Sequence, residues 1–216
     1  MPIFAFFDLD RTVFSINSGF AWLAYERRAG RISPRKFAKG LLALARYTIG
    51  QSDLEPVILE AIKDYEGLPE AVLRERTQDF YRRHVAHTIR VNARATIRRH
   101  QAEGHRCLTL TTSTHYLADL VVQELALDGA LCTRLEAVHG HLTGRPEGRI
   151  CYGSGKLELM TQHLLQHGGH LADTYFYTDS YSDHAALGAV GHPVVVCPDL
   201  RLMRSARRSG WPVERW

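Results

Sequence analysis

The sequence has no apolar run that approaches the roughly 20 residues of a membrane-spanning helix. It does not open on a basic segment followed by an apolar one, as a secretory signal would. Its four cysteines form no C-x-x-C pair, which argues against a zinc site, and internal repeats and low-complexity tracts are missing too. These absences favour a cytoplasmic protein with reduced thiols and no stable membrane association.

Neither sign of charge is in great excess. The 216 residues include 27 Lys and Arg against 23 Asp and Glu, which gives a formal net charge of +4. The basic pairs are scattered, so no continuous surface for nucleic acid is predicted, and a mild positive excess also suits anionic small molecules. A hydrophobic content of 45% is enough for one domain with an insertion or for two small domains. Nothing in the composition predicts an oligomeric state.

Two carboxylates follow the most apolar stretch near the start of the chain. Residues 3–7, Ile-Phe-Ala-Phe-Phe, are typical of a strand buried on both faces, and Asp8 and Asp10 come directly after them. Buried carboxylates need a cation, a donor or solvent, and ligands of open α/β sheets bind at the carboxyl ends of the strands. Turn formation or helix capping is the competing interpretation of both aspartates.

After this strand, residues 15–103 are almost continuously helical in pattern. The helix boundaries are predicted at capping and terminating residues: Asn17 or Ser18, Ser33 before Pro34, Gly50, Asp53 and Pro69. So long a helical stretch exceeds what one crossover needs, so we expect a small helical domain inserted after the first strand. The predicted division is a helical cap at 15–90 and an α/β core at 1–14 and 91–216.

The remainder of the chain alternates strand-like and helix-like segments. The predicted strands are 107–111, 131–134, 174–178 and 193–197. The predicted helices are 114–127, 156–167, 183–190 and 199–209, with a small hairpin at 135–143. This alternation predicts an α/β fold with a Rossmann-like parallel sheet covered by helices on both faces.

The polar segments after the predicted strands should meet, because parallel strands bring their carboxyl ends to one edge. They are Asp8 and Asp10, the Thr111-Thr112-Ser113 run, Lys156 at a helix start, and Asp179 with Asp183. Several carboxylates in one place repel one another unless a cation holds them, and oxygen ligands suit Mg²⁺. A lysine, hydroxyls and helix N–H groups suit a phosphate. Together they predict phosphoryl transfer to an aspartate.

Each of these residues also has an ordinary structural interpretation. A solvated helix lysine is the ordinary interpretation of Lys156, but it fits poorly because the dipole of a helix repels a cation at its N-terminus. Asp183 could cap the helix that it begins, and Thr111 could be a strand-end hydroxyl. A P-loop is excluded, because Ile150 stands where G-x-x-x-x-G-K needs its first glycine. One apolar group is expected to pack within the insertion and not on a membrane surface: Leu41, Leu42, Leu44 and Ile49.

Taken in order, the polar segments resemble the four motifs of the haloacid dehalogenase (HAD) superfamily of phosphohydrolases. Asp8-Leu9-Asp10-Arg11-Thr12 is similar to D-x-D-x-T. The later motifs correspond to Thr111 at a strand end, Lys156 at a helix start and Asp179-x-x-x-Asp183 as the acidic fourth motif. The helical insertion after the first motif resembles subfamily IB, the phosphoserine-phosphatase-like branch. The resemblance covers nearly the whole chain.

The resemblance implies a role for each motif residue. Asp8 is expected to attack phosphorus and become an aspartyl-phosphate, while Asp10 protonates the leaving oxygen and then activates water. The phosphoryl oxygens are expected to bind to Thr111, Thr112 and Lys156. Mg²⁺ is expected to be held by Asp8, the Asp10 backbone carbonyl and Asp179, with Asp183 in support. The implied substrate is a small phosphorylated metabolite.

Two positions depart from the family's pattern. Phosphoserine phosphatases carry a glutamate for the substrate's amino group where this chain has Asn17, and an amide cannot neutralise an ammonium. Thr178 replaces a frequent glycine before the fourth motif. The leading prediction is a Mg²⁺-dependent phosphatase of a small phosphomonoester. Alternatives are phosphoserine phosphatase proper, a phospholipid-headgroup phosphatase, a phosphotransferase, and a regulatory or nucleic-acid-binding protein that needs no intact Asp8.

Overall fold

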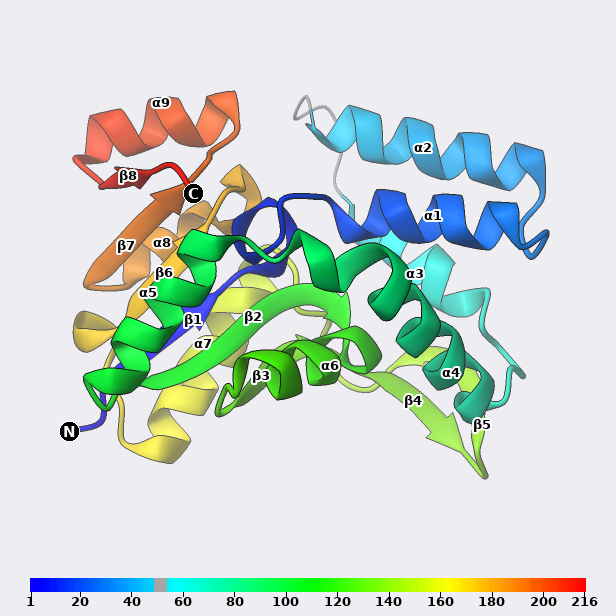
Figure 1. Cartoon of the computed structure of the whole chain (residues 1–216), viewed down its shortest axis with the longest axis horizontal. Coiled ribbons are helices and arrows are strands. Elements are labelled where there is room, and N and C mark those ends of the chain that lie inside the picture. The colour runs from blue at the N-terminus through cyan, green and yellow to red at the C-terminus, as the bar shows by residue number, and fades with distance from the viewer. Residues whose placement is uncertain (49–53) are drawn as a thin grey trace.

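The computed structural model describes residues 1–48 and 54–216, with a six-stranded sheet at its centre (Figure 1). The strand order is β3-β2-β1-β6-β7-β8, and every neighbouring pair is parallel. The strands are β1 (Phe4–Phe7), β2 (Arg106–Thr114), β3 (Gly129–Thr133), β6 (Tyr175–Thr178), β7 (His192–Val196) and β8 (Val213–Glu214). The predicted α/β fold with a Rossmann-like parallel sheet is confirmed.

Different helices cover the two faces of the sheet. Successive side chains of a strand point to opposite faces, so β1 contributes to both cores. Ala5 and Phe7 pack in one core with α5 (Val91–Ala102) and α6 (His115–Leu125). Phe4 and Phe6 pack in a second core with α7 (Ser154–His167), α8 (His184–Ala189) and α9 (Leu200–Ser209). All four β1 residues are buried, as predicted for a strand covered on both faces.

A helical insertion separates β1 from α5, as predicted, and its α1 and α2 lie beyond the carboxyl ends of the strands (Figure 1). Its helices are α1 (Ser18–Arg28), α2 (Pro34–Thr48), α3 (Glu55–Lys63) and α4 (Glu70–Phe80), and a wider helical turn over Tyr81–Val85 continues α4. The domain limits at residues 15 and 90 stay a prediction. Gly50 and Asp53, predicted to end one helix and begin another, lie outside the described residues.

The hairpin of β4 (Leu135–Val138) and β5 (His141–Pro146) packs against this insertion. Three main-chain hydrogen bonds join it to the α3–α4 connection: Gly67 N–H to the Leu142 carbonyl at 2.8 Å, Leu142 N–H to Leu68 at 2.9 Å, and Glu70 N–H to Gly140 at 2.9 Å. Ile62 of α3 and Leu73 of α4 share a buried cluster with Leu135 and Leu142. The hairpin therefore ties the insertion to the chain that follows β3.

Some local predictions hold and others do not. The Asn17 side chain accepts a hydrogen bond from Phe20 N–H at 3.0 Å and caps α1, as predicted. Thr114 precedes α6, but its hydroxyl makes no capping hydrogen bond to that helix. The prediction of packing within the insertion is wrong for Leu41 and Leu42, which are 43% and 53% exposed, and Ile49 lies outside the described residues.

The remaining observations concern thiols and membranes. All four cysteines are free, and Cys107, Cys132 and Cys151 are buried, as predicted. None of the helices in the described part of the chain combines the length and the apolar character that crossing a membrane requires.

Candidate active site

The site lies where the strand order of the sheet reverses. β1 and β6 are neighbours, with β2 on the far side of β1 and β7 on the far side of β6. Ligands of open α/β sheets bind outside the carboxyl ends of the strands at such a point. Asp8 follows β1 and donates its N–H to the Tyr177 carbonyl of β6 at 2.9 Å. Asp8 and Asp179 line one cavity of about 330 Å³.

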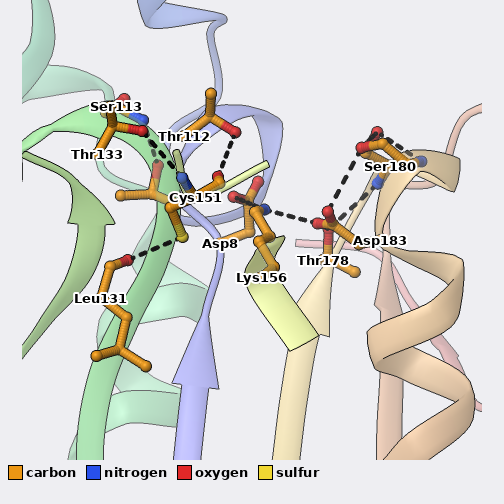
Figure 2. A network of polar contacts seen from close by, with 12 residues as sticks. Asp8, Thr112, Ser113, Leu131, Thr133, Cys151, Lys156, Thr178, Ser180 and Asp183 are labelled. Carbon is orange, nitrogen blue, oxygen red and sulfur yellow. Dashed lines mark hydrogen bonds and ion pairs between the residues drawn. The ribbon is translucent and has the colours of Figure 1, made fainter. Parts of the chain in front are cut away.

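Lys156 joins the first and fourth predicted motifs (Figure 2). Its Nζ donates to Asp8 Oδ1 and to Asp183 Oδ2, each at 2.7 Å, and the residue is only 3% exposed. Burial acts to lower the pKa of Lys156, but the Asp183 and Asp8 carboxylates outweigh it and hold that pKa well above its usual value. Lys156 is therefore a buried, charged lysine, and a solvated lysine of the helix surface is ruled out.

A glycine allows Lys156 to reach this position. A Cβ on Gly155 would lie 2.4 Å from the Ile150 carbonyl oxygen, closer than real Cβ contacts come. The first turn of α7 can therefore pack against residue 150 only because Gly155 has no side chain. The sequence indicated a helix start here, but it gave no sign of this close approach.

Asp183 does not cap α8. Its side chain makes no capping hydrogen bond to that helix, although Asp183 immediately precedes it, and the residue is fully buried. Besides the bond from Lys156, Asp183 Oδ2 accepts one from the Thr178 hydroxyl at 2.7 Å (Figure 2). The threonine that stands at the family's frequent glycine position thus helps to hold the buried carboxylate.

We expect Thr178→Val to lower the free energy of unfolding by about 1–3 kcal/mol, because it removes a hydroxyl donor from a buried carboxylate while keeping the shape of the side chain. Denaturant unfolding measures the change. The matched control is Thr161→Val, whose hydroxyl donates only to the Leu157 carbonyl of its own helix, and it should cost less. Equal effects of the two substitutions would contradict the role of the Thr178 hydroxyl.

Asp10 lies in a wide turn, Leu9–Val13, directly after Asp8. Val13 N–H and Phe14 N–H donate five residues back, to the carbonyls of Asp8 and Leu9. Arg11 adopts a φ of 57°, which is rare for a residue with a side chain. Asp10 Oδ1 accepts a hydrogen bond from Ser18 N–H at 2.7 Å. The Asp10 carboxylate is thereby fixed at the start of α1, and it lines the same cavity.

The pKa values of three carboxyl groups that line this cavity are raised. Burial raises the pKa of Asp8 to about 7; Lys156 opposes the rise and Asp183 adds to it. Burial also raises the pKa of Asp10, against the hydrogen bond from Ser18. Burial, followed by the charges of Asp8 and Asp183, raises the pKa of Asp179 well above its usual value. Burial is the largest cause of all three shifts, and neighbouring carboxylates add to those of Asp8 and Asp179.

The donor set fits a hard divalent cation. Within residues 1–48 and 54–216, no group donates a hydrogen bond to the Asp179 carboxylate, although Asp179 is only 6% exposed. Lys156 acts on Asp8, and Arg11 acts on Asp179. A largely buried carboxylate without a donor must meet water or a cation, and carboxylate oxygens suit Mg²⁺. Asp8 and Asp179 are thus placed to hold such an ion.

Thr111 and Thr112, near the end of β2, differ in the hydrogen bonds that their hydroxyls make. Both line the cavity. Thr111 Oγ1 accepts a hydrogen bond from Ser113 N–H at 3.2 Å and is 2% exposed. Thr112 Oγ1 donates its proton to the Cys151 carbonyl at 3.0 Å (Figure 2). The hydroxyl of Thr111 therefore keeps its proton for a ligand, whereas that of Thr112 is already engaged.

The outer wall of the cavity was not predicted. It is mostly apolar and aromatic, and it is formed by Phe20, Leu44, Leu54, Ile58, Tyr152 and Tyr181. Arg201 lines the wall as well, with its guanidinium 4.1 Å from the centre of the Tyr181 ring. Most of these side chains come from the insertion, and Tyr181 occupies a variable position of the fourth motif. Their apolar or aromatic character was the only signal available in the sequence.

Comparisons with known proteins agree with this geometry. The family model described as haloacid dehalogenase-like hydrolase matches residues 5–188. The chain is 29% identical to phosphoserine phosphatase SerB1 of Mycobacterium tuberculosis, over 97% of this chain and 69% of that protein. It is 27% identical to a histidinol-phosphatase of Neisseria meningitidis, over 99% and 98%. A crystal structure from Bordetella pertussis Tohama I matches with a TM-score of 0.87 and 26% identity, over 99% and 98%.

The chain belongs to the haloacid dehalogenase-like hydrolases, as its motifs predicted. Within that family it is a phosphatase of the phosphoserine-phosphatase-like branch.

Proposed function

We propose that the chain is a Mg²⁺-dependent phosphatase that hydrolyses a small phosphomonoester through an aspartyl-phosphate on Asp8. The observation that carries this proposal is the position of Lys156 Nζ, 2.7 Å from both Asp8 and Asp183, at the strand-order reversal of the sheet. Lys156 leaves Asp8 Oδ2 to attack phosphorus, and it can offset charge on the phosphorylated side chain.

The reaction takes two displacements. A carboxylate oxygen of Asp8 forms a bond to phosphorus while the ester P–O bond breaks, and the leaving oxygen takes a proton from Asp10. Water then gives a proton back to Asp10 and attacks the same phosphorus, which releases phosphate and restores Asp8. A raised pKa helps Asp10 to carry the proton in the first step. Thr111 and Lys156 donate to the phosphoryl oxygens.

Asp8 and Asp179, with the Asp10 backbone carbonyl, would hold the magnesium ion. When bound, the ion neutralises charge on the phosphoryl group and on the aspartates. Asp183 supports the site indirectly, because its carboxylate is engaged by Lys156 and Thr178. This division of roles separates one aspartate that reacts from others that bind or position.

The leaving group is expected to carry an apolar or ring-shaped part and no exposed ammonium. The outer wall is apolar, and the Asn17 side chain already caps α1. The remaining carboxylate in the described lining, Asp199, accepts backbone N–H groups of Tyr181 and Leu202 at 2.9 and 2.7 Å. The Asp199 carboxylate is thus held by the main chain, and the position that carries a glutamate in phosphoserine phosphatases is an asparagine here, which argues against phosphoserine.

A panel of soluble phosphomonoesters, assayed for released phosphate with and without magnesium, tests the proposal. The panel should include phosphoserine, histidinol phosphate and aromatic phosphates. We expect magnesium-dependent release, best from esters with an apolar or ring-bearing leaving group. Lipid phosphates without detergent test the headgroup alternative, and added alcohol acceptors test phosphotransfer. Folded protein that releases no phosphate from any member with magnesium present contradicts the proposal.

Magnesium removal should destabilise the chain more at high pH than at low pH. A carboxyl whose pKa is raised by folding binds its proton more tightly in the folded state. The free energy of unfolding therefore falls as the pH rises from the unfolded pKa to the folded pKa. For Asp8 this window runs from about 4 to about 7. In EDTA we therefore expect the melting temperature to drop across this window. Magnesium at pH 8 should raise it by roughly 5 °C or more. The Asp179→Asn variant should lose most of that rise, and an unchanged rise would argue against ligation by Asp179.

A further inference from the structure

A second cluster of ligand-type side chains lies at the end of α5, away from the aspartates. The helix ends with Gly104 at a φ of +77°, with His105 N–H donating to the His100 carbonyl at 3.0 Å and Gly104 N–H to Gln101 at 3.1 Å. This is the Schellman ending, which brings the side chains of the first and last residues of the turn into contact. An apolar pair usually fills that contact. Here two imidazoles fill it.

The nitrogens of the two imidazoles face each other and a carboxylate. His100 Nδ1 and His105 Nδ1 are 2.8 Å apart, and Glu103 Oε2 is 3.5 Å from His105 Nδ1. One ligand atom from each of the three residues lies within 4.8 Å of the other two. His100 is 1% exposed whereas Glu103 is at the surface, so the cluster opens to solvent on one side.

The buried imidazole is held in an orientation that suits ligation. His100 Nε2 lies 2.8 Å from the Tyr177 hydroxyl of β6. When His100 Nε2–H donates to that hydroxyl, the lone pair of Nδ1 points into the cluster. Metal-bound histidines are commonly fixed in this way through their second nitrogen.

The charges around the cluster act in both directions. Burial, with smaller effects of His105 and of the Arg99 guanidinium, lowers the pKa of His100 to about 4, so the ring is neutral at pH 7 and can act as a ligand. Arg99 opposes a bound cation. The carbonyl end of α5 contributes partial negative charge, and Glu103 adds a full one. A hydrogen bond between the two imidazoles would by itself explain the 2.8 Å contact. It would not explain the position of the Glu103 carboxylate beside them.

We propose that His100, Glu103 and His105 form a binding site for a divalent transition-metal ion, for which Zn²⁺ is the best fit. Two imidazoles and one carboxylate are ordinary zinc ligands, with water as the fourth. The oxygen-rich aspartate site instead suits magnesium. Tetrahedral ligation requires the two nitrogens to separate to about 3.3 Å, from zinc–nitrogen bonds near 2.0–2.1 Å. The proton now shared between the rings then moves to His105 Nε2.

The position of this cluster would let an ion brace the core. His100 contacts Tyr177 through its hydrogen bond, and it packs edge-on against Phe7 of β1 with ring centres 5.9 Å apart. Tyr177 and Phe7 stack on each other at 4.8 Å. A bound ion should therefore fix the end of α5 against the two central strands and raise the melting temperature, since it binds only the folded chain.

Titration of the magnesium-saturated protein with Zn²⁺, followed by calorimetry and by melting temperature, tests this site. Excess magnesium competes with zinc at the aspartates, and zinc that still binds there is retained in both cluster variants. We expect one zinc ion per chain whose affinity falls at least roughly tenfold in Glu103→Gln and in His105→Asn. His100 is left in place because it packs in the core. The matched control is His167→Asn, which alters another pair of stacked imidazoles, with ring centres 4.1 Å apart, on the surface of α7.

The outcomes are distinct. Loss of zinc affinity and of the zinc-induced stabilisation in the two cluster variants, with retention in His167→Asn, supports the site. Equal zinc binding by wild type and by the Glu103→Gln, His105→Asn double variant overturns it, as does equal loss in His167→Asn. Because the readout is zinc binding in all cases, the result is independent of the phosphatase activity.

Discussion

Asp8→Asn should abolish phosphate release while leaving the chain folded. The substitution keeps the shape of the side chain and its ability to accept a hydrogen bond from Lys156, but an amide oxygen is too weak a nucleophile to form the acyl-phosphate bond. We expect kcat to fall by roughly 10⁴-fold or more, in line with the loss of other enzymatic nucleophiles. Phosphate release under saturating substrate and magnesium measures the effect.

Stability separates loss of chemistry from loss of structure in this variant. Burial raises the pKa of Asp8 to about 7. Above that pH Asp8 is ionised in the metal-free folded chain, where its charge costs more than in the unfolded chain. Asp8→Asn in EDTA at pH 8 should therefore melt at the wild-type temperature or higher. The control is Asp128→Asn, which removes a carboxylate that pairs with Arg106 far from the cavity and should keep full activity. Turnover by Asp8→Asn within about tenfold of wild type would rule out this residue as the nucleophile.

Lys156→Met should have the largest effect on stability. The substitution keeps much of the side-chain volume but leaves Asp8 and Asp183 buried without their shared cation, which each now meets at 2.7 Å. Removing one partner of a buried ion pair costs about 3–5 kcal/mol, because the remaining charge is desolvated and uncompensated. We expect a loss of this size in denaturant unfolding at pH 8 in EDTA, together with loss of inhibition by vanadate.

The chain offers a surface counterpart for comparison. Lys39 Nζ lies 2.6 and 2.8 Å from the two Glu60 oxygens, and both side chains are exposed. Lys39→Met should cost far less than Lys156→Met, because water screens an exposed pair. Adding Asp183→Asn to Lys156→Met should recover part of the lost stability, since it removes one of the stranded charges. Equal costs for the two lysine substitutions would show that burial of the Lys156 pair is energetically unimportant.

Much of the fold was predictable because its signals are local. The all-apolar run before Asp8 requires burial on both faces, and the alternation of strands and helices requires crossovers, so the parallel sheet follows. Strand β8 was not predicted, because Val213–Glu214 is too short to show a pattern and exists only by pairing with β7. Leu41 and Leu42 were expected to pack within the insertion but are exposed. Amphipathic spacing shows that a helix has an apolar face, but it cannot show whether another element of the chain covers that face.

For the site, only the residues that follow strand ends or begin a helix beside them could be placed together from the sequence. Sequence order and the carboxyl-edge rule were enough to gather Asp8, Asp179 and Lys156 in one prediction. They could not show that Asp183 would bond to Thr178 and not cap α8, because that choice depends on a lysine 27 residues earlier in the sequence. The apolar wall and the histidine cluster on α5 depend on tertiary contacts in the same way.

The hairpin β4–β5 limits how substrate can enter. Its main-chain bonds to residues 67–70 make the α3–α4 connection behave as a third strand of the hairpin. A movement of the α3–α4 connection that opens the cavity would therefore require the hairpin to move with it, or would break three hydrogen bonds.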